Sequence, residues 1–289
     1  MRKVHPVARI VFIAPAVIWF CAAVIYPIFV SIYYSFFDWD GITAMRFIGV
    51  DNYFELVRDP LVGRVVMNSL TIAFFSVFFQ IPLGLLLAVV LYNRRVKGRN
   101  FFRTLYFLPV VLSSAMIGIL WSQIYNPNFG LINAILGRMG VQSPPVWLGD
   151  PNLALGSVIV VLIWQFIGYQ MLLYYMALHN IPEELMEAAA IDGATPVKQF
   201  FKIQLPLLWP TISITILLVT VNSIRYFDLI WIMTGGGPNY ASEVLATYLF
   251  RTAFRSLRFG YSSTISVLLL AVGALFVLIN RRMLRANTD

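Results

Sequence analysis

The chain has 289 residues, of which 60% are hydrophobic and only 12% are charged, and its net charge is +8. Ordinary soluble domains carry about 25% charged residues, so the composition excludes that class and indicates a membrane protein. The single cysteine excludes an internal disulfide bond and a CxxC metal site.

Six apolar segments approach or exceed the roughly 20 residues that a membrane-spanning helix needs. They cover residues 10–36, 66–92, 105–125, 153–178, 208–233 and 262–280. Arg2 and Lys3 precede the first segment, as in a signal peptide, but its apolar stretch is longer than the about 7–15 residues of a signal core, so we expect it to be retained. The sequence therefore predicts an all-α, polytopic membrane protein with six transmembrane helices in a single domain over residues 1–289.

The basic residues predict the orientation of these spans. With both termini in the cytoplasm, thirteen of the 21 Lys and Arg residues lie inside and seven lie outside. Because basic residues favour the cytoplasmic side, we expect cytoplasmic N- and C-termini in the cell (plasma or inner) membrane. Five of these charges crowd one short internal segment: Arg94, Arg95, Lys97, Arg99 and Arg103. At a membrane face, anionic lipid explains such a cluster better than nucleic acid does.

The segment between the fourth and fifth spans is polar and contains turn signals. Pro182, followed by two glutamates, suits the first turn of a short helix. Asp192-Gly193-Ala194 reads as a turn in which Gly193 has positive φ. A second short helix can begin at Thr195-Pro196, a cap followed by proline, and Pro206 and Pro210 mark its exit into the fifth span. The sequence thus predicts a cytoplasmic loop made of two short helices.

This segment resembles the cytoplasmic EAA loop that permeases of ATP-binding-cassette importers present to their ATPase subunits. It reads EAAAIDGATPVKQFFKIQLPLLWP over residues 187–210. The stretches FFRTLYFLPVV, WSQIYNPNFGLIN and FDLIWIMTGGGP, and Gly260-Tyr261 before the last span, resemble the same family, so the resemblance covers nearly the whole chain. The TGGGP form is typical of the first permease of the pair in the maltose, glycerol-phosphate and oligosaccharide class.

The resemblance implies a function and a set of partners. It implies import of a sugar or oligosaccharide together with a second homologous permease, two cytoplasmic ATPase subunits and an extracytoplasmic solute-binding protein. The chain itself would be no enzyme and would hold no cofactor or metal, since ATP and Mg would bind to the ATPase; the sequence also lacks a GxxxxGK[ST] phosphate loop. The residues implied in coupling to the ATPase are Glu187, Ala188, Ala189, Asp192, Gly193, Ala194, Phe200, Ile203, Leu205 and Pro206.

The external segments are residues 37–65, 126–152 and 234–261. They are rich in turn residues and include an amphipathic stretch over residues 131–139. They are read either as connectors with interfacial helices or as the docking face for the solute-binding protein.

Two helical faces inside the membrane combine amide, hydroxyl and aromatic groups. Counted at 1.5 Å per residue from the cytoplasmic ends near Asn180 and Leu208, Phe166 and Asn222 both lie roughly 21 Å deep. Such groups hydrogen-bond hydroxyls and stack on sugar rings, and in maltose-type permeases the helices that flank the EAA loop contact the sugar. We therefore predict a substrate path formed by Gln165, Phe166, Tyr169, Asn222, Ser223 and Tyr226. The alternative for each residue is a hydrogen bond that holds two helices together.

Arg225 and Asp228 lie inside the fifth predicted span. A charged side chain at the bilayer centre costs about 2.5–3.5 kcal/mol. Their i,i+3 spacing on one helix predicts an ion pair that borders a cavity; contact of Arg225 with the substrate is the alternative. His5 and His179 are each isolated and predict neither a metal site nor a catalytic group.

Two rival functions stay open. One is an ion-coupled secondary carrier, although such carriers usually show internal repeats or several intramembrane ionisable residues. The other is the same ATP-binding-cassette architecture importing glycerol phosphate or another polar solute. Dependence of uptake on an ATPase separates the first rival from the importer.

Overall fold

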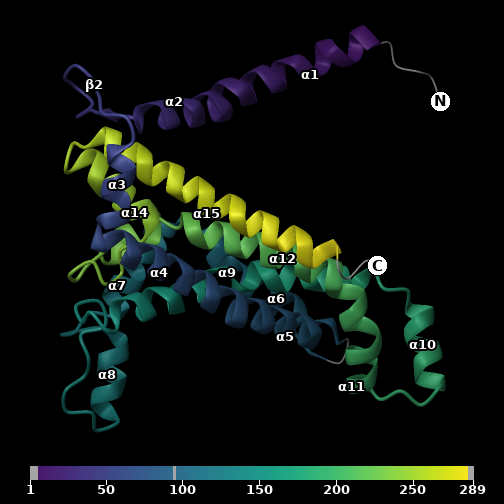
Figure 1. The fold of residues 1–289 in the computed structure, drawn as a ribbon. Coiled ribbons are helices and arrows are strands. Elements are labelled where there is room, and N and C mark those ends of the chain that lie inside the picture. The colour runs from purple at the N-terminus through teal and green to yellow at the C-terminus, as the bar shows by residue number, and fades with distance from the viewer. Residues whose placement is uncertain (1–5, 94–95, 286–289) are drawn as a thin grey trace. The chain divides into compact units, whose positions relative to one another are not determined.

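The computed structural model describes residues 6–93 and 96–285. Some residues used in the sequence analysis lie outside the described residues: Arg2, Lys3, His5, Arg94 and Arg95. The chain, drawn in Figure 1, divides into two compact units. The first comprises Met1–Val62 and Leu249–Ala271, and the second comprises Gly63–Tyr248 and Val272–Asp289. The single domain expected over residues 1–289 stays a prediction.

The first unit begins with a long apolar helical run. Its main elements are α1 (Pro6–Phe20), η1 (Cys21–Ile25), α2 (Tyr26–Tyr34), β1 (Phe37–Asp38), β2 (Arg46–Phe47), α3 (Asp51–Arg58), most of α14 (Leu245–Phe254) and the first part of α15 (Phe259–Arg285). The two short strands pair antiparallel, with Phe37 opposite Phe47, and are the exception to the all-α prediction. Within their hairpin, hydrogen bonds from the backbone N–H groups of Thr43 and Ile42 lower the pKa of the Asp40 carboxyl.

The start of α15 is fixed to the rest of the first unit by the Gly260-Tyr261 motif. A β-carbon at Gly260 would lie 1.9 Å from the carbonyl oxygen of Phe37, so only glycine permits this approach. The Tyr261 hydroxyl donates to Asp59 at 2.8 Å. Arg258, two residues before Gly260, donates to both carboxylate oxygens of Glu55 at 2.7 and 2.6 Å. The motif therefore has a structural role in this unit.

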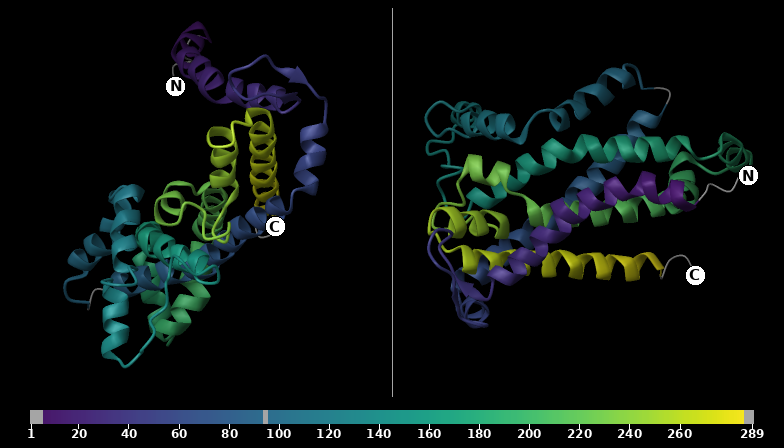
Figure 2. Two further views of the ribbon diagram at one scale, coloured as in Figure 1. Left: turned by 90° about the vertical axis from the view of Figure 1, so that its left-hand side faces the viewer. Right: turned by 90° about the horizontal axis from the view of Figure 1, so that it is seen from above.

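The remaining helices follow in chain order. They are α4 (Pro60–Phe75), η2 (Ser76–Gln80), α5 (Ile81–Tyr92), α6 (Arg99–Val111), α7 (Ser114–Ile124), α8 (Leu131–Arg138), α9 (Ala154–His179), α10 (Glu183–Ile191), α11 (Pro196–Gln199), η3 (Phe200–Gln204), α12 (Leu205–Arg225), α13 (Asp228–Met233) and the start of α14. In the second unit α9 and α12 run side by side, and α8 and α10 lie at opposite ends of the bundle (Figures 1 and 2). One apolar cluster includes Ile117, Leu162 and Ile230, and another includes Met171, Tyr174 and Leu208.

Each of the three π-helical segments η1, η2 and η3 ends two residues before a proline. These prolines are Pro27, Pro82 and Pro206. Proline has no N–H, and its ring collides with the carbonyl four residues earlier. In all three cases that carbonyl lies inside the π-helical segment, where the wider turn accommodates the ring. The helices therefore continue through the prolines instead of ending at them.

Five long apolar helices in the described part of the chain match predicted spans one, two, four, five and six. They are Phe12–Tyr34, Pro60–Tyr92, Ala154–His179, Pro196–Arg225 and Phe259–Asn280. The third predicted span is not one helix, because Arg99–Val111 and Ser114–Ile124 meet at an angle of 101°. Ser113 causes the new start: its Oγ accepts a hydrogen bond from the Met116 N–H at 3.3 Å and so caps α7.

Candidate functional site

Two helix breaks in the second unit border a cavity of about 400 Å³. One separates α6 from α7, and the other separates α12 from α13. At the second break Tyr226 has φ −58° and ψ 125°, so the chain leaves the helical conformation. The cavity is lined by Ser114, Leu162, Phe166, Asn222, Arg225, Tyr226, Phe227, Asp228 and Leu229. Irregular backbone at membrane depth is tolerated where it borders such a cavity.

Three of the six residues predicted to form the substrate path line this cavity: Phe166, Asn222 and Tyr226. The rings of Phe166 and Tyr226 are stacked, with centroids 5.8 Å apart and an interplanar angle of 29°. Asn222 is exposed. A stacked aromatic pair beside an amide offers apolar contact and hydrogen bonding in one place. The structure thus brings together side chains from the two helices that the sequence analysis selected.

The other three, Gln165, Tyr169 and Ser223, do not line the cavity. Ser223 is fully buried and its hydroxyl donates to the Val219 carbonyl of its own helix at 2.7 Å. Gln165 is buried beside the cavity, with its Nε2 3.5 Å from Ser114 Oγ. Tyr169 is exposed elsewhere on α9. Helical spacing groups residues that lie within about 100° of one another, whereas the cavity borders only part of each such face.

The predicted ion pair of Arg225 and Asp228 does not form in the described part of the chain, and the prediction that both lie on one helix is wrong. Helix α12 ends at Arg225 and α13 begins at Asp228. Each charge suits its own helix end, since a cation is favoured at a C-terminus and an anion at an N-terminus. Both side chains are exposed and line the cavity. The cavity therefore presents a guanidinium and a carboxylate that do not neutralise each other directly.

Two polar or aromatic lining residues, Ser114 and Phe227, were absent from the predicted site. Ser113-Ser114 could have predicted the first helix break, because serine before an apolar run caps helices. Tyr226-Phe227 carries none, because neither glycine nor proline marks this break.

The polar segment between α9 and α12 folds as a helix, a turn and a second helix, as predicted. At the end of α10, Gly193 has a φ of +77°. Its N–H donates to the Ala190 carbonyl at 3.1 Å, and the Ala194 N–H donates to the Ala189 carbonyl at 2.9 Å. These two bonds form a Schellman motif, in which glycine satisfies the last carbonyls of a helix.

The second helix begins as predicted but is not short, which corrects the prediction. Thr195 caps it through a hydrogen bond from the Lys198 N–H to the threonine hydroxyl at 3.4 Å. From there, α11, η3 and α12 form one continuous helix, Pro196–Arg225. The helix does not end at Pro206, because the wider π-helical turn of η3 accommodates the proline ring. One rod of 30 residues, about 45 Å long, thus joins the loop to the cavity.

The loop exposes half of the ten residues implied in coupling. Glu187, Ala188, Asp192, Gly193 and Pro206 are exposed; Ala189, Ala194, Phe200, Ile203 and Leu205 are half-buried. Gln199 holds α10 against α11, since its Nε2 donates to the Met186 carbonyl at 3.4 Å and the Ala194 carbonyl at 3.3 Å. On α10, Ile191 is 87% exposed. One exposed apolar side chain does not indicate a contact surface, but no described residue of α10 is buried, so the whole helix is exposed in this chain.

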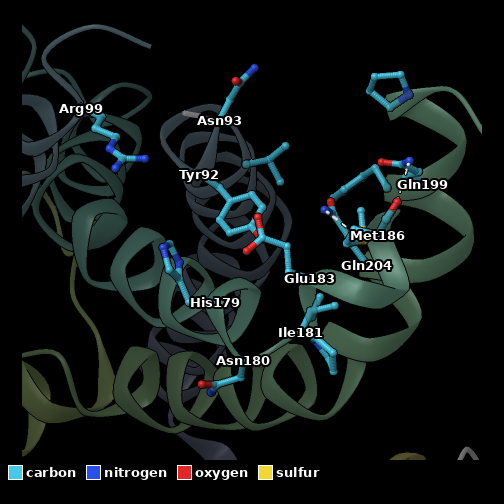
Figure 3. A pocket seen from close by; sticks show the side chains of 14 residues that line it. Tyr92, Asn93, Arg99, His179, Asn180, Ile181, Glu183, Met186, Gln199 and Gln204 are labelled. Carbon is cyan, nitrogen blue, oxygen red and sulfur yellow. Dashed lines mark hydrogen bonds between the residues drawn. The ribbon is translucent and has the colours of Figure 1, made fainter. Parts of the chain in front are cut away.

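A groove of about 920 Å³, here called the polar groove, lies between this loop and the ends of α5, α6 and α9. Figure 3 shows Arg99 and His179 along one side of it and Met186, Gln199 and Gln204 along the other. The centroids of the His179 and Tyr92 rings lie 5.0 Å apart, and His179 Nδ1 lies 2.9 Å from the Tyr175 carbonyl oxygen.

Comparison with known proteins identifies the class of molecule that this architecture represents. The family described as "Binding-protein-dependent transport system inner membrane component" matches residues 80–286. The chain is 38% identical over 281 residues to the probable ABC transporter permease protein YurN of Bacillus subtilis, with 96% of each chain covered. It is 33% identical over 248 residues to the multiple sugar-binding transport system permease protein MsmF of Streptococcus mutans, covering 86% of this chain and 84% of that protein.

The fold also has a solved counterpart. A chain of a bacterial ABC transporter involved in the import of the acidic polysaccharide alginate superposes with a TM-score of 0.85 at 24% identity, covering 96% of this chain and 95% of that one. At this identity the likeness concerns the fold. The protein belongs to the family of binding-protein-dependent transport system inner membrane components. It is a multi-pass membrane permease of an ATP-binding-cassette importer.

Proposed function

We propose that this permease translocates a sugar or short oligosaccharide. The cavity between the two helix breaks carries this proposal, because it sets the stacked rings of Phe166 and Tyr226 beside the exposed amide of Asn222. Aromatic faces pack against the apolar face of a sugar ring, while amide and charged groups bind its hydroxyls. The relative MsmF, named as the permease of a multiple sugar-binding transport system, supports the same class of solute.

The transporter contains further subunits in this proposal. A second homologous permease completes the translocation path, and an extracytoplasmic solute-binding protein delivers the sugar. Two cytoplasmic ATPase subunits bind ATP and Mg and hydrolyse the nucleotide. The N- and C-termini of this chain lie in the cytoplasm of a cell whose plasma or inner membrane it spans, which puts the loop with α10 on the ATPase side.

Coupling follows from the continuous helix. The ten coupling residues named above lie on α10, in the turn at Gly193 and on the first part of the continuous helix, and the exposed surface of α10 contacts the ATPase. When the ATPase dimer closes, it displaces α10, and the helix Pro196–Arg225 transmits this displacement to Asn222 and Arg225 at the cavity. Rigid-body rocking of the spans then alternates access to the cavity.

One observation favours a second solute class. Arg225 lines the cavity without a hydrogen bond or ion pair to any described residue. A guanidinium binds phosphate or carboxylate well, so glycerol phosphate or another anionic solute is the alternative cargo. Asp228 is exposed in the same cavity. Its carboxylate repels an anionic solute and so favours a neutral sugar.

The test compares Asn222→Ala with Ser223→Ala in the complete transporter reconstituted in vesicles. A hydrogen bond contributes about 0.5–1.5 kcal/mol, so Asn222→Ala should lower ATP-dependent sugar uptake several-fold. Ser223→Ala should not, because its hydroxyl bonds only its own helix. Both variants should retain ATPase activity stimulated by the loaded binding protein. Equal uptake by the two variants would contradict the substrate path, and uptake without the ATPase would favour an ion-coupled carrier.

A further inference from the structure

A second groove runs along the outside of α5 and shares lining residues with the polar groove. This apolar groove has a volume of about 430 Å³ and is lined mainly by Leu85 and Leu86 of α5 and by Val197 and Phe201 of α11 and η3. Val89, Pro196 and Phe200 line both grooves. The two grooves therefore adjoin at these three side chains.

The apolar groove lies on a helix long and apolar enough to span a membrane, and its lining is exposed. Leu86 belongs to the continuous apolar helix Pro60–Tyr92 and precedes its end by six residues, or about 9 Å. Leu86, Val197 and Phe201 are 58%, 67% and 58% exposed. Because this helix is apolar and long enough to cross a membrane, the exposed apolar groove on it is open to lipid chains.

The polar groove supplies a cation at the membrane surface. Arg99 lines it and makes no hydrogen bond or ion pair with any described residue. Lys97, two residues before Arg99, is exposed, and so is Lys198 on α11. Glu183 also lines the groove, from α10, but it already has an interaction partner, whereas Arg99 belongs to α6 (Figure 3). Arg99 therefore leaves a guanidinium available to a phosphate.

We propose that the two grooves bind one anionic phospholipid, with its phosphate at Arg99 and an acyl chain between Leu86 and Phe201. One wall of this site is α5, and the other is the start of the helix that leads from the loop to the cavity. The lipid therefore contacts the element that moves when the loop moves. The rival occupant of the apolar groove is a helix of the second permease.

Native mass spectrometry of the complete transporter tests the proposal. Phosphatidylglycerol and phosphatidylcholine with identical acyl chains are added in mild detergent, and the retained lipid is counted. The wild type should retain phosphatidylglycerol preferentially. Arg99→Gln should lower this retention about fivefold, the ratio expected for one basic residue near an anionic lipid. Lys97→Gln is the matched control and should have a smaller effect, because Lys97 does not line the groove.

The acyl-chain site is tested separately. Leu86→Trp fills the apolar groove and should release the lipid, whereas Leu83→Trp on the same helix lies outside the groove and should retain it. Equal retention of the two lipids, or no effect of Arg99→Gln, would overturn the proposal. So would displacement of phosphatidylglycerol by soluble glycerol 3-phosphate, which would assign a phosphate site without a chain. A photo-crosslinker at position 86 that captures the second permease instead of lipid would overturn it as well.

Discussion

Gly193 turns the chain between α10 and α11 with a φ of +77° and has open space around its α-carbon. A side chain there meets no neighbour, so any effect of a substitution arises from backbone strain of about 1 kcal/mol for alanine and more for a β-branched residue. We expect Gly193→Val to misdirect α10 and to lower ATP-dependent uptake while the binding protein still captures sugar. Vesicle uptake and ATPase stimulation, measured together, show this uncoupling.

Gly137 provides the control for this experiment. It lies in α8, has open space around it and has no positive φ, so Gly137→Ala should leave uptake unchanged. Wild-type uptake by Gly193→Val would show that the turn does not determine coupling.

At the scale of the helix, α9 is the element against which α5 and α6 pack. A β-carbon at Gly84 of α5 would lie 2.6 Å from the Gln170 β-carbon on α9, and one at Gly168 of α9 would lie 1.9 Å from the Tyr106 carbonyl oxygen on α6. Small residues allow such close backbone approach between membrane helices. These two glycines therefore fix the spacing of α5 and α6 around α9.

We expect Gly168→Ala to destabilise the protein by about 1–3 kcal/mol, because an overpacked contact forces neighbouring backbone to move. Gly156→Ala on the same helix meets nothing within 4 Å and should be neutral. Thermal unfolding of both variants in detergent, monitored by size-exclusion chromatography, measures the difference in their stability. Similar midpoints for the two variants would refute the close contact of α6 and α9.

At the scale of the whole molecule, the proposed topology predicts which positions face each side of the membrane. In a Cys21→Ala background, cysteines at Lys97 and Lys198 should be protected from an impermeant maleimide added outside. Cysteines at Asp51, Gln142 and Asn239 should react. The positive-inside preference gives the direction, and within the second unit α8 and α10 already lie at opposite ends (Figure 1). External labelling at position 198 would invert the topology and remove the loop from the ATPase.

The sequence predicted the loop between α9 and α12 well because its signals are local. Thr195 caps the helix that follows it, and Gly193 takes the one conformation that closes α10. The length of the second helix was wrong because prolines at 206 and 210 normally end helices, whereas a π-helical turn ahead of Pro206 keeps the hydrogen-bonded ladder continuous.

The two helix breaks were not predicted, for different reasons. Counting apolar residues along the sequence ignores backbone angles. It therefore predicted one span over residues 105–125 and missed the helix start that Ser113 caps. At Tyr226-Phe227 no residue in the sequence requires a break. There, Leu229 and Ile230 of α13 are almost fully buried in a cluster with Ile117 and Leu162, so packing from other helices favours the new direction of the chain.

By itself the sequence determined the membrane class, the apolar segments, the caps and turn of the loop and the motifs of the family, since each depends on composition or on residues a few positions apart. Only the tertiary structure decided that Phe166 stacks on Tyr226, that the Ser223 hydroxyl bonds a carbonyl of its own helix and that Arg225 and Asp228 belong to separate helices. Those outcomes depend on how α7, α9, α12 and α13 pack together. A helical period states which residues share a face, but the neighbouring helices decide which part of that face borders a cavity.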